Sequence, residues 1–189
     1  GGTRIGFEQA CSEKGFKSKC VFTSEIKDHA ISVYSHNFPN SKIFGDITKV
    51  DPKNIPDFDY LLAGFPCQPF SSAGKRNGFL DERGGLFFTI QKILEIKKPS
   101  GFLLENVDGL ATHDNGKTLE VIISKLKSLK YKVSWKILDA SEFGVPQRRK
   151  RIYIVGNKEF LPSLENFKTS FNNAGKFIEH NFPVKPTPF

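Results

Sequence analysis

The sequence contains no methionine, one tryptophan and three cysteines among its 189 residues. Cys11, Cys20 and Cys67 are odd in number and lack the spacing of a zinc or redox site, which favours reduced thiols in a cytoplasmic protein. No apolar run approaches the length of a transmembrane helix, and no signal-peptide pattern is present. A complete translated protein normally begins with methionine, whereas this chain begins with Gly1-Gly2, so we expect it to be a piece of something longer.

The aromatic content and the net charge indicate one folded domain with a basic surface. Aromatic residues make up 13% of the chain, with 19 phenylalanines, which argues for a packed core and against disorder. The formal net charge is +8, which favours a polyanionic partner. Charge alone decides nothing, because many basic proteins simply have solvated lysine faces.

Helical and extended patterns alternate along the chain, which predicts an α/β fold with a mostly parallel sheet and helices on both faces. The predicted strands are 19–24, 43–44, 60–63, 101–104, 133–138 and 151–155, the last two paired. The predicted helices are 6–14, 27–37, 86–97 and one around 119–129, capped by Asp114 or Asn115. The periodicity fades after Leu161, so we expect a domain over residues 1–160 and a linker or the start of another domain over 161–189.

A cysteine follows one of the predicted strands at a rigid turn. The segment Gly64–Ser71 reads Gly-Phe-Pro-Cys-Gln-Pro-Phe-Ser, and its prolines restrict the backbone on both sides of Cys67. Ligands of open α/β sheets bind at the carboxyl ends of strands, so Cys67 is a candidate nucleophile. The alternative is a buried, inert thiol, which is what most lone cysteines are.

Two further groups belong to the ends of other predicted strands. Glu105-Asn106 follows the strand 101–104, and the basic segment Gln147–Arg151 leads into the last strand. If these strands are neighbours, a thiol, a carboxyl group and guanidinium groups meet at one edge, where the cations favour the thiolate and partial burial keeps a proton on Glu105. Separately, each has an ordinary explanation as a turn, a cap or a solvated face.

Together and in this order, these segments resemble the motifs of the cytosine-5 DNA methyltransferase family, and the resemblance extends to about residue 156. Gly64–Ser71 is similar to its catalytic Pro-Cys loop, Glu105–Val107 to its Glu-Asn-Val motif, and Gln147–Arg151 to its Gln-Arg-x-Arg element. The segment from Gly74 to Leu86 resembles the mobile loop that closes over DNA. The family implies a Rossmann-like, S-adenosylmethionine-dependent methyltransferase fold, here truncated at both ends.

The resemblance also implies a mechanism. Cys67 would add to carbon 6 of a cytosine flipped out of duplex DNA, and Glu105 would hold and protonate N3. Arg151, together with Arg149, would anchor O2 and orient the carboxylate, and carbon 5 would then take the methyl group of S-adenosylmethionine. Asn106 and Gln147 would support the site.

The cofactor residues are likewise implied by the resemblance. Gly1 and Gly2 are similar to the end of the family's glycine-rich first motif, Glu25 would bind the ribose hydroxyls, and Asp46 would accept from the adenine amino group. Further apolar positions would flank the adenine or complete the wall; they are Ile26, Ile47, Pro66 and Leu86. Without the resemblance, Glu25 and Asp46 read as a solvated charge and a turn residue.

The preferred interpretation is a bacterial DNA methyltransferase, the modification partner of a restriction system, cytoplasmic and associated with the nucleoid when bound to DNA. No target recognition domain follows residue 156, so a missing region or a second subunit would read the DNA sequence, and we expect weak or no activity from these 189 residues alone. The alternatives are the tRNA-methylating branch of the family and a catalytically idle nucleic-acid-binding module. A cysteine hydrolase is weaker, because no motif pairs Cys67 with any of the four histidines.

Overall fold

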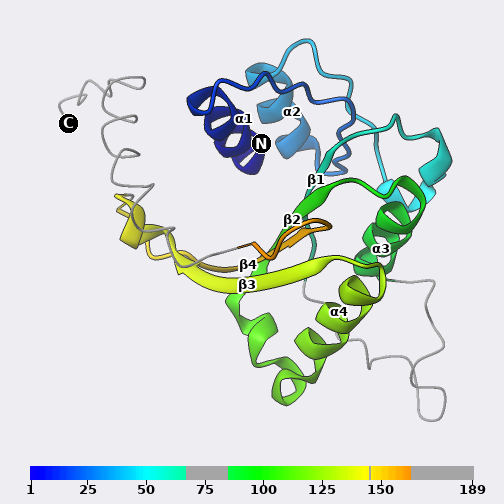
Figure 1. Cartoon of the computed structure of the whole chain (residues 1–189). Helices are drawn as coiled ribbons and strands as arrows, with labels where there is room; N and C mark the ends of the chain where they lie inside the picture. Colours follow the sequence, from blue (N-terminus) through cyan, green and yellow to red (C-terminus); the bar gives the residue numbers. More distant parts are fainter. Residues whose placement is uncertain (67–84, 145, 163–189) are drawn as a thin grey trace.

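The computed structural model describes residues 1–66, 85–144 and 146–162, and its centre is a four-stranded sheet in the order β1-β2-β4-β3 (Figure 1). The strands are β1 (Tyr60–Gly64), β2 (Gly101–Val107), β3 (Lys132–Asp139) and β4 (Lys150–Asn157). β1 runs parallel to β2, whereas β4 is antiparallel to both β2 and β3. The α/β class is therefore confirmed, as is the pairing of the last two strands, and the sheet is mixed rather than mostly parallel.

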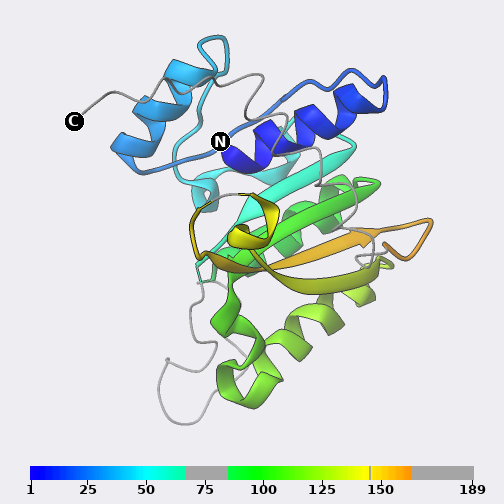
Figure 2. The same ribbon diagram turned by 90° about the vertical axis from the view of Figure 1, so that its left-hand side faces the viewer.

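Helices lie at two places around this sheet. α1 (Gly2–Glu13) and α2 (Asp28–Asn37) lie together at the β1 end of the sheet, apart from α3 (Leu86–Lys97) and α4 (Lys117–Ser128) (Figures 1 and 2). Short 3-10 turns connect the elements: η1 (Ile47–Lys49), η2 (Pro52–Asn54), η3 (Asp108–Ala111), η4 (His113–Gly116) and η5 (Ala140–Phe143). Within the described ranges, every helix is too short or too polar to cross a membrane.

The hydrophobic core lies between the sheet and the helices α3 and α4. Side chains alternate along a strand, so Phe102 and Leu104 of β2 face these helices while Leu103 and Glu105 face the opposite side. α4 contributes the expected stripe, with Leu119, Ile122 and Leu126 buried at helical spacing. α1 and α2 contribute no buried residue, although Phe7 packs on the Tyr60 ring at a centroid distance of 5.6 Å. Helices were predicted on both faces of the sheet. The buried core lies on the face that α3 and α4 cover.

Several predicted boundaries were wrong. The segments 19–24 and 43–44 form no strand; they meet in one parallel bridge between Ser24 and Phe44. The first helix begins at Gly2 rather than at residue 6. Gly116 caps α4, because Asp114 and Asn115 adopt positive φ values of 49° and 53° within η4.

The predicted helix Leu86–Lys97 was confirmed at both ends. It ends where Lys98 turns left-handed, with φ of 50°, ahead of Pro99, which cannot continue a helix. The boundary predicted at residue 160 stays a prediction.

Candidate active site

A row of cross-strand neighbours on the sheet face opposite the core defines the candidate site. Gly64 of β1 lies opposite Glu105 of β2, Glu105 lies opposite Tyr153 of β4, and Tyr153 lies opposite Lys136 of β3. Directly opposed residues share one face of a sheet. Glu105 and Asn106 therefore lie inside β2, near its carboxyl end, rather than beyond it.

The carboxylate of Glu105 is held by the two predicted arginines. Arg151 Nε lies 3.0 Å from Glu105 Oε1, and Arg149 Nη2 lies 4.0 Å from the same oxygen. The Glu105 and Arg151 side chains are 26% and 22% exposed, and Arg149 is 51% exposed. The sequence prediction that these side chains converge is confirmed, and the closer pair is the more enclosed one.

The backbone that carries Arg149 is held by a residue the sequence analysis missed. Asp139 Oδ1 accepts hydrogen bonds from the amides of Ser141, at 3.1 Å, and Arg149, at 3.0 Å. The Ala140 amide also donates to the Arg149 carbonyl oxygen at 3.1 Å. The Ser141 amide in particular lowers the pKa of Asp139, so this carboxylate stays ionised and keeps its acceptor. An aspartate at a strand end before Ala-Ser was the available signal, since it is a common turn former.

Tyr153 was also missed by the sequence analysis. Burial first, and then the neighbouring Glu105 carboxylate, raise its pKa, so the phenol remains a hydrogen-bond donor at neutral pH. Its position opposite Glu105 follows from the strand register, which is visible only once the pairing of β2 and β4 is known.

Asn106 is buried on the other face of β2, with 2% exposure. Its Oδ1 accepts from the Val107 amide at 2.8 Å, whereas its Nδ2 has no hydrogen-bond partner among the residues that the structure describes. A buried amide donor without a partner is expensive, by about 1–3 kcal/mol.

The remaining residues predicted near the reaction are either exposed or lie outside the described residues. Gln147 and Pro66 are exposed. Cys67 and most of the segment predicted to close over DNA lie outside the described residues; the chain is described up to Pro66, the neighbour of Cys67 in sequence.

Two carboxylates predicted to bind the cofactor lie on adjacent segments. The Glu25 amide donates to the Phe44 carbonyl at 3.0 Å, and Ser24 Oγ donates to the Gly45 carbonyl. These bonds bring the segment of Glu25 beside that of Asp46. Ile26 follows Glu25 and is 65% exposed, and Ile47 is the first residue of η1.

Each of these carboxylates makes its hydrogen bonds through a single oxygen. Glu25 Oε1 accepts from the amides of Ile26 and Lys27, at 2.9 and 3.1 Å, just before α2 begins. Asp46 Oδ1 accepts from the amide and hydroxyl of Thr48, which lower the pKa of Asp46. Among the described residues, the second oxygen of each carboxylate accepts no hydrogen bond. Leu86, also predicted here, is the first residue of α3 and packs against the core.

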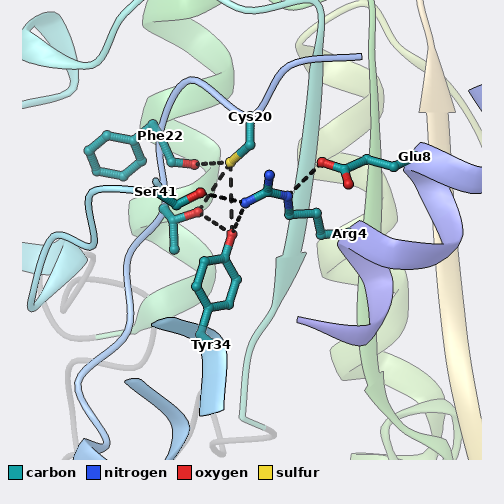
Figure 3. Close-up of polar contacts among 7 residues, drawn as sticks. Arg4, Glu8, Cys20, Phe22, Tyr34 and Ser41 are labelled. Atoms are coloured by element: carbon teal, nitrogen blue, oxygen red, sulfur yellow. Dashed lines mark hydrogen bonds and ion pairs between the residues drawn. The ribbon is translucent and has the colours of Figure 1, made fainter. Parts of the chain in front are cut away.

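Gly1 and Gly2 lie at the amino end of α1, and their part in cofactor binding stays a prediction. A Cβ on Gly1 would lie 3.4 Å from the ring of Phe38, which follows the carboxyl end of α2, whereas Glu25 precedes the amino end of that helix. Arg4 anchors the first turn of α1 at this place (Figure 3). Arg4 donates to Tyr34 Oη and Ser41 Oγ, each at 2.8 Å, and its guanidinium lies 3.8 Å from the Phe38 ring centroid.

Comparison with solved structures shows to which class of protein this fold belongs. The Dnmt2 methyltransferase of S. pombe matches 85% of this chain and 50% of its own, with a TM-score of 0.67 and 25% identity. A Spodoptera frugiperda DNMT2 mutant matches 85% of this chain and 49% of its own, with a TM-score of 0.66 and 29% identity. The architecture is that of an S-adenosylmethionine-dependent methyltransferase.

Sequence comparison identifies the family. The model of the C-5 cytosine-specific DNA methylases matches residues 1–183, so the chain belongs to that family. It is 51% identical to the Type II methyltransferase M.NlaIV of Neisseria lactamica and 53% identical to M.NgoBV of Neisseria gonorrhoeae, in both cases over 100% of this chain. The chain spans 46% of the length of each of these relatives.

Proposed function

We propose that this chain carries the catalytic part of an enzyme that methylates carbon 5 of cytosine in duplex DNA, as the modification enzyme of a restriction-modification system. The observation that carries the proposal is the Glu105 carboxylate held by Arg151 at the carboxyl end of β2, beside the strand that leads to Pro66 and Cys67. Membership of the C-5 cytosine-specific DNA methylase family supports the same reaction.

In this mechanism the protein activates a carbon that is otherwise a poor nucleophile. The Cys67 thiolate bonds to carbon 6 of a flipped cytosine, and the electron pair of the 5,6 double bond becomes available at carbon 5. Glu105 gives a proton to N3 as negative charge develops there. Arg151 holds O2, and its ion pair with Glu105 keeps the carboxylate in place. After carbon 5 is methylated, a base removes the proton from that carbon, the sulfur–carbon 6 bond breaks, Cys67 leaves as thiolate, and N3 returns its proton to Glu105.

S-adenosylmethionine supplies the methyl group when it is bound. The residues at the edge formed by the segments of Glu25 and Asp46 fit this molecule, because each carboxylate keeps one oxygen without a hydrogen bond from the described residues. Glu25 would accept from the ribose hydroxyls and Asp46 from the adenine amino group, with Ile26 and Ile47 along the ring. Pro66 and Leu86 would complete the wall.

Asn106 and Gln147 are proposed as supports of this site rather than as reacting groups. The unpartnered Nδ2 of Asn106 supports this role for Asn106, since a backbone carbonyl of the cysteine segment would satisfy it. Replacing Asn106 with leucine is expected to lower the rate of methyl transfer while leaving the binding of S-adenosylmethionine unchanged.

Recognition of a particular DNA sequence is proposed to lie outside these residues, in a further region or a second subunit. The chain spans 46% of the length of the relatives named above, and we expect weak or no turnover from it alone. The enzyme is proposed to act in the bacterial cytoplasm, on the nucleoid.

A transfer assay tests the function directly. The chain, and a longer version matched in length to the relatives, receive tritium-labelled S-adenosylmethionine with duplex DNA or with tRNA, and Cys67→Ser serves as the control. Label in DNA that is lost in Cys67→Ser supports the proposal. Label in tRNA alone would assign the chain to the RNA branch, and DNA binding without label would leave an idle binding module.

A further inference from the structure

Gly64 stands where a side chain would meet the catalytic carboxylate. It is the last residue of β1 and lies directly opposite Glu105 in the parallel register. A Cβ on Gly64 would lie 3.3 Å from Glu105 Oε2 and 4.0 Å from the Glu105 carbonyl oxygen. The first of these distances is shorter than an ordinary van der Waals contact between carbon and oxygen.

The carboxylate can withdraw from such a Cβ only by disturbing its contacts with the two arginines. Its Oε1 is held from the β4 side by Arg151 at 3.0 Å, with Arg149 at 4.0 Å. The guanidinium of Arg151 is itself fixed, because its Nη1 donates to the Lys150 carbonyl oxygen at 2.6 Å. Glu105 is therefore clamped on one side and placed over Gly64 on the other.

Backbone conformation does not explain the glycine. The described glycines with positive φ are Gly15, Gly116 and Gly144, and Gly64 is not among them. A glycine inside a strand weakens the strand and commonly marks a place where another group approaches closely. Here the approaching group is Glu105 Oε2.

The two oxygens of Glu105 have different surroundings. Oε1 faces guanidinium N–H donors, which need lone pairs, so a proton on Oε1 would remove an acceptor from Arg151. Oε2 faces the side of β1, the strand that leads to Cys67, and accepts no hydrogen bond from a described residue. A proton on this carboxyl group is therefore placed on Oε2.

We infer that Gly64 is a positioning residue, whose missing side chain keeps Glu105 Oε2 open as the oxygen that exchanges a proton with the substrate base. The inference rests on the proposed function and adds a division of labour within Glu105. Oε1 anchors the carboxyl group to the arginines, and Oε2 faces the reaction. Gly64 influences the chemistry only through Glu105.

The test is Gly64→Ala in the longer version of the protein, with Gly109→Ala as the matched control, since a Cβ on Gly109 meets nothing within 4 Å. Gly64→Ala should lower kcat about ten- to a hundredfold, as expected for a displaced catalytic group, with the KM for DNA changed less than about threefold. In a Glu105→Gln background the same change should not lower kcat further, because the glutamine side chain has no carboxyl proton to give to the base. Wild-type kcat in Gly64→Ala, or an equal loss in the Glu105→Gln background, would overturn the inference.

A crystal structure of the Gly64→Ala variant gives a readout independent of turnover. The Glu105 carboxylate should turn away from the new methyl group, and an unmoved carboxylate would also overturn the inference. If the unaltered protein transfers no methyl group to DNA, the proposed function fails, while the crystal structure still decides whether Gly64 sets the position of Glu105.

Discussion

The ion pair between Glu105 and Arg151 should show a measurable coupling energy in the free energy of unfolding. At the observed 3.0 Å, two unit charges interact by about 5.5 kcal/mol at an effective dielectric constant of about 20, and by about 1.4 kcal/mol in bulk water. The side chains keep 26% and 22% of their exposure, and folding removes part of their hydration. We therefore expect a coupling of about 1–2 kcal/mol.

The assay is a double-mutant cycle by urea denaturation, with Glu105→Gln, Arg151→Gln and the double variant. A second cycle on Lys97 and Asp57 is the control, because this pair has the same 3.0 Å separation but Asp57 is 94% exposed. The control coupling should be smaller and should vanish more readily in salt. A Glu105–Arg151 coupling within about 0.5 kcal/mol of zero would refute the reasoning, because such values are expected of independent sites.

Three further changes test the structure around the site and in the core. Asp139→Ala removes the acceptor of the Arg149 amide and should lower kcat more than the KM for DNA in a steady-state assay; equal effects on both would contradict this. Burial raises the pKa of Tyr131 from 10.0 to about 12, so its neutral phenol stabilises the fold up to pH 10 and this contribution is lost as pH rises through 12. Tyr131→Phe should therefore flatten the fall of the melting temperature between these values, and an unchanged fall would count against the assignment. Gly156→Ala would place a methyl group against the buried Phe102 ring and should lower the free energy of unfolding by about 1–3 kcal/mol, measured with urea; no loss would mean that the ring can move aside.

The elements that sequence patterns predicted best are those whose signals are local. The helix Leu86–Lys97 combines an apolar stripe with a stop at Lys98-Pro99, and both belong to the segment itself. The convergence of Glu105 with Arg151 was also predictable, since both positions were placed at strand ends that share one edge of the sheet.

The errors arise where a distant partner decides the structure. A strand exists only if another strand pairs with it, and residues 19–24 find one bridge partner at Phe44. The first turn of α1 is held by the bonds of Arg4 to Tyr34 and Ser41, which no periodicity reveals, and the predicted helix began too late. The register that puts Gly64 and Tyr153 beside Glu105 likewise depends on strand order.

The most direct test of the proposed mechanism is covalent trapping on duplex DNA that contains 5-fluorocytosine, with S-adenosylmethionine present. Fluorine at carbon 5 blocks the final elimination, so a working Cys67 leaves a stable protein–DNA adduct. The mechanism predicts an adduct with the longer version of the protein that disappears in Cys67→Ser. Tight DNA binding without any adduct, or an adduct that survives Cys67→Ser, would contradict it.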